Sequence, residues 1–413
     1  MSLGLMNRLR EEFGFIQGNY LVLVVSWILM DFAMELPGTY YSLYVLALGG
    51  SAVAIGLIGF TSFIALASVQ FPGGYLADRF GRRWLVTTMT FAVAFSFILY
   101  ALAPSWHWIL LGALINGLCL IYQPALMAMI ADSVPSERRG MGFSIITLIE
   151  RTASTPAPAL AGLLFLMYGL VSGMRIGYGI MVALFLVAAL LRTRLRETIK
   201  TVEKPRVKDI VASYPQALRD GVAVWRVVPR SMFYLFITGL IGFASFMMVQ
   251  PFFVVYAVEE LGIPESDWWI LMTFLSLVII VFAIPCGKLI DKVGRKKPLL
   301  LSYAFTALSM FFFVFGDEFR IFIAMLLGGV GQVLAMSASF SLQADLVPRE
   351  YRGKVVGFTN FMNYIAISVA QLSAGFIYQE ISHQLLFFLV ILLQIPALVI
   401  TLMRVHEAEE REA

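Results

Sequence analysis

Apolar runs of about 18 residues or more recur along the whole chain of 413 residues, and they constrain its fold more than any other feature. A helix of that length crosses the hydrocarbon core of a bilayer, which is about 30 Å thick. Only 14% of the residues are charged and 60% are hydrophobic, too few charges for the surface of a water-soluble protein of this length. The sequence therefore predicts an all-α membrane protein.

We read twelve spans from this pattern. They cover approximately 20–46, 52–77, 84–103, 106–131, 141–168, 172–191, 231–257, 267–289, 298–316, 321–343, 355–378 and 384–403. The first run is too long and too acidic for a cleavable signal peptide, so we expect it to stay as a span. The dipeptides Pro37-Gly38 and Gln123-Pro124 are predicted to break their helices.

Lys and Arg residues are distributed unevenly over the loops. Of the 30, 27 fall in the two termini and one alternating set of loops, ten of them in the central loop, and two fall in the other set. By the positive-inside rule this bias predicts a cell-membrane protein with both termini in the cytoplasm. The net charge of +4 is then a topology signal, so we expect the lipid bilayer, and not nucleic acid, as the partner of these charges.

One charged turn occurs twice in the sequence. The stretch GYLADRFGRR (74–83) returns 213 residues later as GKLIDKVGRK (287–296), and ADSVPSERRG and ADLVPREYRG repeat at the same spacing. Because that spacing contains six spans, both copies point the same way across the membrane. The sequence predicts two six-helix bundles, 1–192 and 231–413, joined by a basic cytoplasmic linker at 193–230. Two parallel halves with a substrate site between them are typical of rocker-type secondary transporters.

The repeated turn resembles the loop signature of the major facilitator superfamily, G-x-x-x-D-(R/K)-x-G-R-(R/K), which lies between the second and third spans. Its residues here are Gly74, Asp78, Arg79, Gly81, Arg82 and Arg83, and in the degenerate second copy Gly287, Asp291, Lys292, Gly294, Arg295 and Lys296. The resemblance covers nearly the whole chain. It implies the major facilitator fold and transport by alternating access.

The motif also implies a cytoplasmic gate. Gly74 is expected to let a neighbouring helix approach closely, and Gly81 to permit a tight turn. The resemblance implies that Asp78 faces the N-terminal end of the eleventh span, where a helix favours negative charge, and so holds the two halves together. Asp291 is expected to act likewise against the fifth span. Further gate residues are expected at Asp132 and Asp345, and the alternative is that all these charges only enforce topology.

Charged residues inside the predicted spans are the second functional signal. The stretch WILMDFAMELPG (27–38) places Asp31 and Glu35 on one face of the first span, and the fifth span carries Glu150 and Arg151. Counting about 1.5 Å per residue, Asp31 and the Glu150-Arg151 pair lie roughly 15 Å deep, near the midplane. Charges there are costly.

Three acids and one arginine leave an excess of negative charge, so at least one carboxyl has to carry a proton or bind a cation. We therefore expect Asp31, Glu35, Glu150 and Arg151 to couple transport to protons or another cation. The alternative is a purely structural ion-pair network between the first and fifth spans.

Neutral polar residues occupy matching positions in the second half. Glu150 and Arg151 correspond to Asn363 and Tyr364 at the repeat spacing. Other polar residues near the midplane are Asn116, Gln123, Gln250 and Gln332. Each is a candidate for the substrate cavity or, alternatively, forms a helix–helix hydrogen bond. The pattern predicts coupling in the first half and neutral substrate contacts in the second.

Within the superfamily the chain is most similar to the twelve-span drug–proton antiporters. The resemblance rests on ELPGTYYSLYVLALGGSAVAIGLI, which leads into the loop motif, and on ASTPAPALAG (153–162). The antiporter signature at the latter place is G-x-x-x-G-P-x-x-G-G, and alanine replaces three of its four glycines here. The basic residue usual in the fourth span is absent. The resemblance implies proton-coupled export of lipophilic or cationic compounds, and the alternative is a proton-coupled symporter or facilitator for a small nutrient or organic ion.

An enzyme is not expected. His107, His383 and His406 lie at or outside the span ends, and no catalytic or metal-ligand set converges in the sequence. We expect no cofactor and no metal site. We expect a monomer that acts on a small-molecule substrate with a proton or another cation as the coupling ion.

Overall fold

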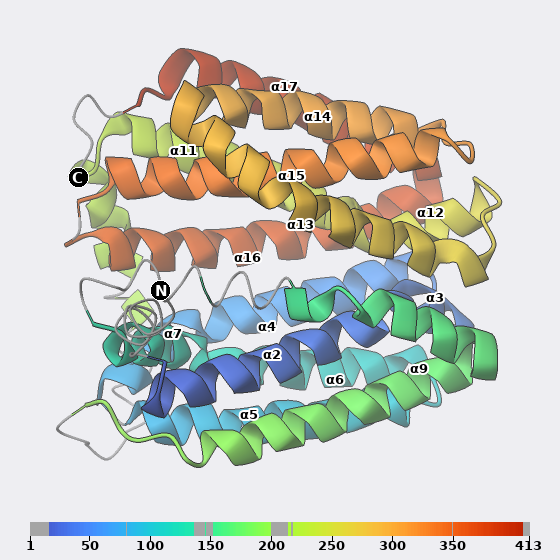
Figure 1. Cartoon of the computed structure of the whole chain (residues 1–413), viewed down its shortest axis with the longest axis horizontal. Helices are drawn as coiled ribbons and strands as arrows, with labels where there is room; N and C mark the ends of the chain where they lie inside the picture. Colours follow the sequence, from blue (N-terminus) through green and yellow to red (C-terminus); the bar gives the residue numbers. More distant parts are fainter. Residues whose placement is uncertain are drawn as a thin grey trace, which may run out of the picture.

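The protein is described by a computed structural model that covers residues 16–79, 81–135, 145, 152–199, 214–215, 218–348 and 350–407. Its helices form two stacked bundles, one from each half of the chain, and both bundles run along the long axis of the molecule (Figure 1). The first described helix begins, and the last one ends, at the same end of the bundles (Figure 1). We call this end the terminal face and the other end the opposite face.

The N-terminal bundle is built from α2 (Gly18–Gly38), α3 (Tyr41–Ala47), α4 (Ala52–Arg79), α5 (Arg82–Ala101), α6 (Trp106–Cys119), η1 (Leu120–Tyr122), α7 (Gln123–Ser133) and α9 (Ala157–Arg192). The C-terminal bundle is built from α11 (Arg230–Val249), η4 (Gln250–Phe252), α12 (Phe253–Glu259), η5 (Glu265–Asp267), α13 (Trp268–Val293), α14 (Lys296–Val314), α15 (Arg320–Leu346), α16 (Arg352–Phe376), η6 (Ile377–Ile381) and α17 (His383–Arg404), with η3 (Val224–Arg226) before it.

Eleven helical segments among the described residues are long and apolar enough to cross a membrane. Ten of them match predicted spans to within a few residues, and the span predicted at 20–46 is divided between α2 and α3, so the prediction of an all-α membrane fold is confirmed. The remaining span, predicted at 141–168, lies partly outside the described residues. Its described end forms the first part of α9, which folds back on itself at Gly169 (φ +73°).

Both predicted helix breaks are present. Helix α2 ends at Gly38 and α3 starts at Tyr41. The second break turns α6 into η1, and α7 restarts at Gln123 with a proline in its first turn, where a missing N–H costs no hydrogen bond. The structure adds a third break at Gln250 that the sequence interpretation did not include, 213 residues after Pro37.

Glycines with positive φ mark the repeat in the backbone. Gly49 (φ +79°) and Gly262 (φ +66°) form one pair, and Gly81 (φ +96°) and Gly294 (φ +89°) form another, each with the repeat spacing. Residues with a Cβ rarely adopt this conformation. The tight turn predicted at Gly81 is therefore confirmed, and the two halves turn in the same way.

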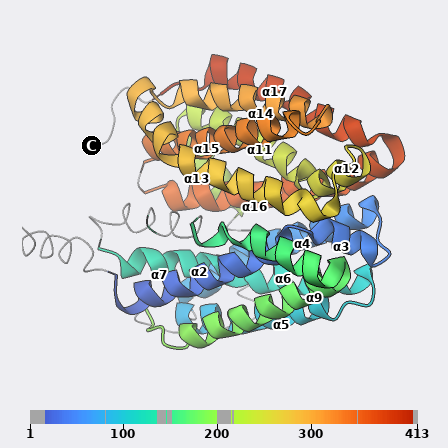
Figure 2. The same cartoon turned by 45° about the vertical axis from the view of Figure 1, so that its right-hand side comes forward.

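The halves meet along α4 and α16, which lie side by side at the boundary between the bundles (Figures 1 and 2). Near the opposite face this contact involves the backbones themselves. A Cβ on Gly56 would lie 2.4 Å from the carbonyl oxygen of Gln371, and one on Gly375 would lie 2.7 Å from that of Ala52. The absence of side chains at these glycines thus permits the close packing.

A second contact at the same face joins α9 to α13, because a Cβ on Gly162 would lie 2.2 Å from the Trp269 ring. The buried apolar core is continuous between the two halves here. In the C-terminal bundle near the terminal face, by contrast, the core around Leu299 and Leu342 forms a separate cluster. The two halves are thus joined mainly at the opposite face.

Candidate functional site

The predicted coupling acids Asp31 and Glu35 lie one turn apart on α2, which packs against α9 and α7. Asp31 is half-buried and Glu35 is exposed. They are the acidic residues of a helix that is otherwise apolar and long enough to cross a membrane. Their predicted companions Glu150 and Arg151 lie outside the described residues, so the arrangement of the complete set stays a prediction.

A third charged residue lies inside this bundle, and the sequence interpretation missed it. Arg192, at the end of α9, is 1% exposed. Its Nε donates to Ser26 Oγ (3.0 Å) and its Nη1 to Thr90 Oγ1 (2.7 Å), and its guanidinium carbon lies 5.5 Å from the centroid of the Tyr122 ring. The count of loop charges assigns this residue to the central loop. No sequence signal separates it from the exposed Arg194 two residues later.

The gate motif of the first half is fixed by contacts within that half. The guanidinium of Arg82 pairs with Asp132 at the end of α7, and it lies 3.7 Å from Asp78. Glu197, just after α9, accepts the backbone N–H groups of Arg82 (3.2 Å) and Arg83 (3.0 Å). A carboxylate at the first residues of a helix satisfies free donors and favours the helix dipole.

The second copy repeats this brace. Arg295 pairs with Asp345 (3.0 Å), and the backbone N–H of Lys296 donates to Glu407 (2.8 Å). The arginines and aspartates keep the repeat spacing, whereas Glu197 and Glu407 do not, which is why sequence comparison of the halves missed the two glutamates. In this structure Asp132 and Asp345 hold the motif to its own bundle.

The structure does not place Asp78 against the start of α16. Its side chain is 74% exposed, and among the described residues it forms an ion pair with Arg82. A Cβ on Gly74 would meet no atom of the described residues within 4 Å, and the same holds for Gly287. The close approach expected at Gly74 is made instead by Gly73, whose Cβ would lie 2.2 Å from the carbonyl oxygen of Ile121.

The remaining gate residues lie at the surface of the terminal face. Arg79 lies over the ring of Tyr75 at 5.0 Å, and Asp291 is exposed. The start of the fifth span, which we expected to face Asp291, lies outside the described residues. The inter-bundle role of the gate therefore stays a prediction for an arrangement in which this face is closed.

Two of the predicted cavity residues meet across the boundary between the halves. The Tyr364 hydroxyl on α16 donates to Gln123 Oε1 on α7 (3.4 Å). The Tyr364 ring also stacks on Phe63 of α4, with ring centroids 6.3 Å apart. A polar contact at this place joins the halves about midway along α16, where a substrate site between the bundles is expected.

The other cavity candidates are not brought together in this way. Asn116 Nδ2 donates to Ser96 Oγ (3.3 Å), which is the helix–helix hydrogen bond of the alternative interpretation. Asn363 Oδ1 is buried and has no hydrogen-bond partner among the described residues. Gln250 is exposed and Gln332 half-buried.

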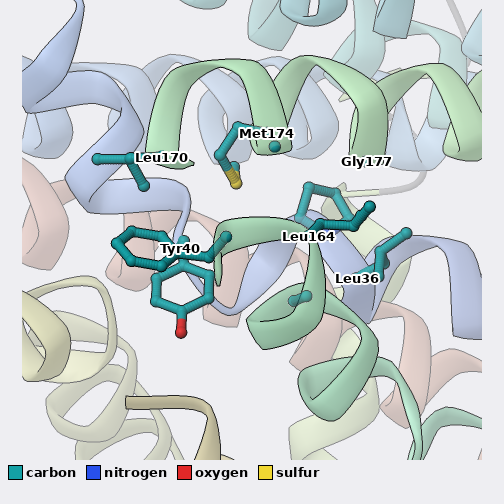
Figure 3. A pocket seen from close by; sticks show the side chains of 10 residues that line it. Leu36, Tyr40, Leu164, Leu170, Met174 and Gly177 are labelled. Carbon is teal, nitrogen blue, oxygen red and sulfur yellow. The ribbon is translucent and has the colours of Figure 1, made fainter. Parts of the chain in front are cut away.

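A small pocket between α2 and the two arms of α9 has an apolar lining that includes Leu36, Tyr40, Leu164 and Met174 (Figure 3). Its volume is about 10 Å³, at the limit for a single water molecule. It is a packing gap and not a site for a substrate.

Comparisons with known proteins agree with this architecture. The family model of the Major Facilitator Superfamily matches residues 23–270 and 235–413. A Na(+), Li(+), K(+)/H(+) antiporter of Planococcus maritimus is 26% identical over 370 residues, which cover 83% of this chain and 85% of that protein. The multidrug resistance protein MdtG of Citrobacter koseri is 26% identical over 298 residues, covering 69% of this chain and 70% of the relative.

Among solved structures, a mutant of the nucleoside transporter NupG superimposes with a TM-score of 0.73 at 16% identity, covering 94% of this chain and 100% of that chain. At this identity the likeness shows the fold alone. The resemblance inferred from the repeated loop motif is confirmed, because the family model matches both halves. The chain belongs to the Major Facilitator Superfamily, and it is a membrane transporter and not an enzyme.

Proposed function

We propose that this transporter exports lipophilic or cationic compounds in exchange for protons. The observation that carries the proposal is the position of Asp31 and Glu35 one turn apart on α2, a helix otherwise apolar and long enough to span the bilayer. Carboxyls in a span are expensive unless they serve a proton or cation pathway. The similarity to MdtG supports a multidrug substrate class.

A second candidate is exchange of a monovalent metal cation for protons. It is favoured by the similarity to the Na(+), Li(+), K(+)/H(+) antiporter, which extends over 83% of this chain. The same two carboxyls serve both candidates, since a carboxylate that releases a proton becomes a site for another cation. The candidates differ in which ion or compound drives proton release.

The proposed orientation places the protein in the cell membrane with its termini in the cytoplasm, in line with the distribution of Lys and Arg. The structure is then closed towards the outside, since the glycine contacts of α4 with α16 lie at the opposite face. The exposed Asp78 at the terminal face fits an inward-facing arrangement. We propose that Asp78 reaches α16 only when the transporter turns outward.

Proteoliposomes with an interior pH dye test the proposal. The liposomes start with an interior more acidic than the outside solution. Tetraphenylphosphonium is added outside in one series and NaCl or KCl in another, and exchange for internal protons appears as a rise in interior pH. We expect the wild type to exchange protons for one of these, and Asp31→Asn to fall to the signal of protein-free liposomes. Glu35→Gln should reduce the coupled flux less, because Glu35 is more exposed.

Glu318→Gln is the matched control, because this exposed acid lies in the loop before α15. It should transport like the wild type. Undiminished proton-coupled flux in folded Asp31→Asn would exclude Asp31 from the mechanism and refute the proposed function at this site.

A further inference from the structure

Arg192 is a buried cation whose partners among the described residues are all neutral. Its described contacts are the hydroxyls of Ser26 and Thr90 and the ring of Tyr122, and no carboxylate among the described residues lies within 4 Å of its guanidinium. Ser26 and Thr90 each lie eight residues after the start of their helices. At about 1.5 Å per residue this places the guanidinium roughly 12 Å inside the terminal face.

The fold does not require a charge at this place. In the C-terminal bundle Thr90 corresponds to Tyr303 at the repeat spacing, and the Tyr303 hydroxyl lies 3.3 Å from Thr401 Oγ1 on α17, with the Thr238 hydroxyl of α11 close by. The same three-helix junction is thus filled by neutral hydroxyl groups. Burying a guanidinium at this junction costs much more desolvation free energy than burying hydroxyl groups.

The partners of Arg192 do not depend on it either. The Ser26 hydroxyl donates to the Leu23 carbonyl oxygen (3.0 Å), and the Thr90 hydroxyl donates to that of Val86 (2.6 Å). Both hydroxyls would therefore keep a partner without the arginine. A cation in the last turn of α9 gains from the helix dipole, but an exposed side chain would gain the same without the cost of burial.

We propose that Arg192 is a positioning residue for coupling: a fixed internal counter-charge to the carboxyls of the first bundle. The inference rests on the proposed function. Asp31 lies five residues beyond Ser26 on α2, about 7.5 Å further along the helix axis and about 140° around it, so Arg192 would act on it through space and not by contact. The sequence predicts an excess of negative charge for the set Asp31, Glu35, Glu150 and Arg151. The positive charge of Arg192 reduces this excess by one.

Other ionisable groups surround this junction. The helices packed around Arg192 also carry Tyr20, Asp31 and Glu35 on α2, Arg82, Arg83 and Tyr100 on α5, His107 and Cys119 on α6, Asp132 on α7, and Tyr168, Arg175 and Tyr178 on α9 itself. Arg82 and Asp132 pair with each other at the terminal face. Asp31 and Glu35 are thus the carboxyls of these helices that lie deeper than Arg192, towards the opposite face.

The experiment measures the pH dependence of coupled transport in proteoliposomes for Arg192→Gln and Arg192→Met. Loss of the positive charge makes the carboxyls hold their protons at higher pH, so the profile should move to higher pH. Because the two charges lie on different sides of α2, more than about 10 Å apart in a partly hydrated interior, the expected shift is about half a pH unit. Arg192→Lys keeps the charge and should restore the wild-type profile.

Tyr303→Phe is the matched control, because it disturbs the equivalent neutral junction and should leave the profile unchanged. Arg192→Gln retains polar contacts to Ser26 and Thr90, so it separates loss of charge from loss of packing. A folded Arg192→Gln with the wild-type profile would refute the counter-charge while leaving the proposed function intact. If the transport rate of the wild type did not depend on pH, that result would instead refute the proposed function, and this inference with it.

Discussion

Arg82 and Arg295 show how much one side chain of the gate motif does inside its own bundle. Arg82 is 13% exposed and pairs with Asp132 from a different helix, while Glu197 holds the backbone of the same turn. Arg295 repeats the pair with Asp345. The motif therefore joins three segments of each bundle at the terminal face, whatever it does between the bundles.

Arg82→Gln and Arg295→Gln should each lower the stability of the protein. The lost pair is largely buried on the arginine side, but Asp132 is 41% exposed, so water screens part of the loss and we expect about 1 kcal/mol for Arg82. Thermal unfolding in detergent should show a melting temperature lower by a few degrees. The control is Lys292→Gln, an exposed residue of the second motif copy. Equal melting temperatures for Arg82→Gln and wild type would contradict the brace.

At the scale of helices, α4 and α16 form the main contact between the halves. The Gln371 side chain fills the space over Gly59, and its Nε2 donates to the carbonyl oxygen of Met247 on α11 (3.1 Å). One end of this contact is fixed by the Val53 N–H, which donates to Gln379 Oε1 (3.1 Å). A carrier that alternates access has to separate this contact once in every cycle.

Cross-linking Val53→Cys to Gln379→Cys should therefore stop transport. A bifunctional thiosulfonate reagent would hold the opposite face closed, and a reducing agent should restore the rate. Cys119 and Cys286, the free cysteines of the described chain, are first replaced by alanine. Each single-cysteine variant treated with the same reagent is the control. Full transport by the cross-linked protein would show that this face does not open.

The helices themselves were predictable because apolar length, proline breaks and glycine turns are local signals. Gly81 and its repeat are examples, since a positive φ depends on the residue itself. The contacts between helices were not predictable in the same way. Adjacent glycines look alike in sequence, yet a Cβ on Gly73 would meet Ile121, while one on Gly74 would meet no described residue within 4 Å. Likewise, only packing shows that Arg192 turns inward.

At the scale of the whole molecule, the structure shows the two bundles in contact at the opposite face, which is one of the two states that alternating access requires. The two contact points there are related by the repeat, because Gly162 meets Trp269 as Gly375 meets Gly56. At the terminal face, a Cβ on the motif glycine Gly74 would meet nothing within 4 Å in the described part of the chain. When the transporter changes the side to which it is open, we expect the contacts at the opposite face to separate while contacts at the terminal face form.

Gly56→Val and Gly74→Val should consequently shift the molecule in opposite directions. A side chain at Gly56 strikes the backbone of α16, a clash worth about 1–3 kcal/mol that is relieved when the opposite face opens. Valine at Gly74 fits this arrangement and opposes closure of the terminal face.

Spin labels at Trp84 and Lys354, exposed residues of α5 and α16, report the distance between bundles at that face. Gly56→Val should populate shorter distances and Gly74→Val should not, with the unsubstituted labelled pair as the reference. Identical distance distributions in all three proteins would refute the idea that these two glycines balance the two faces.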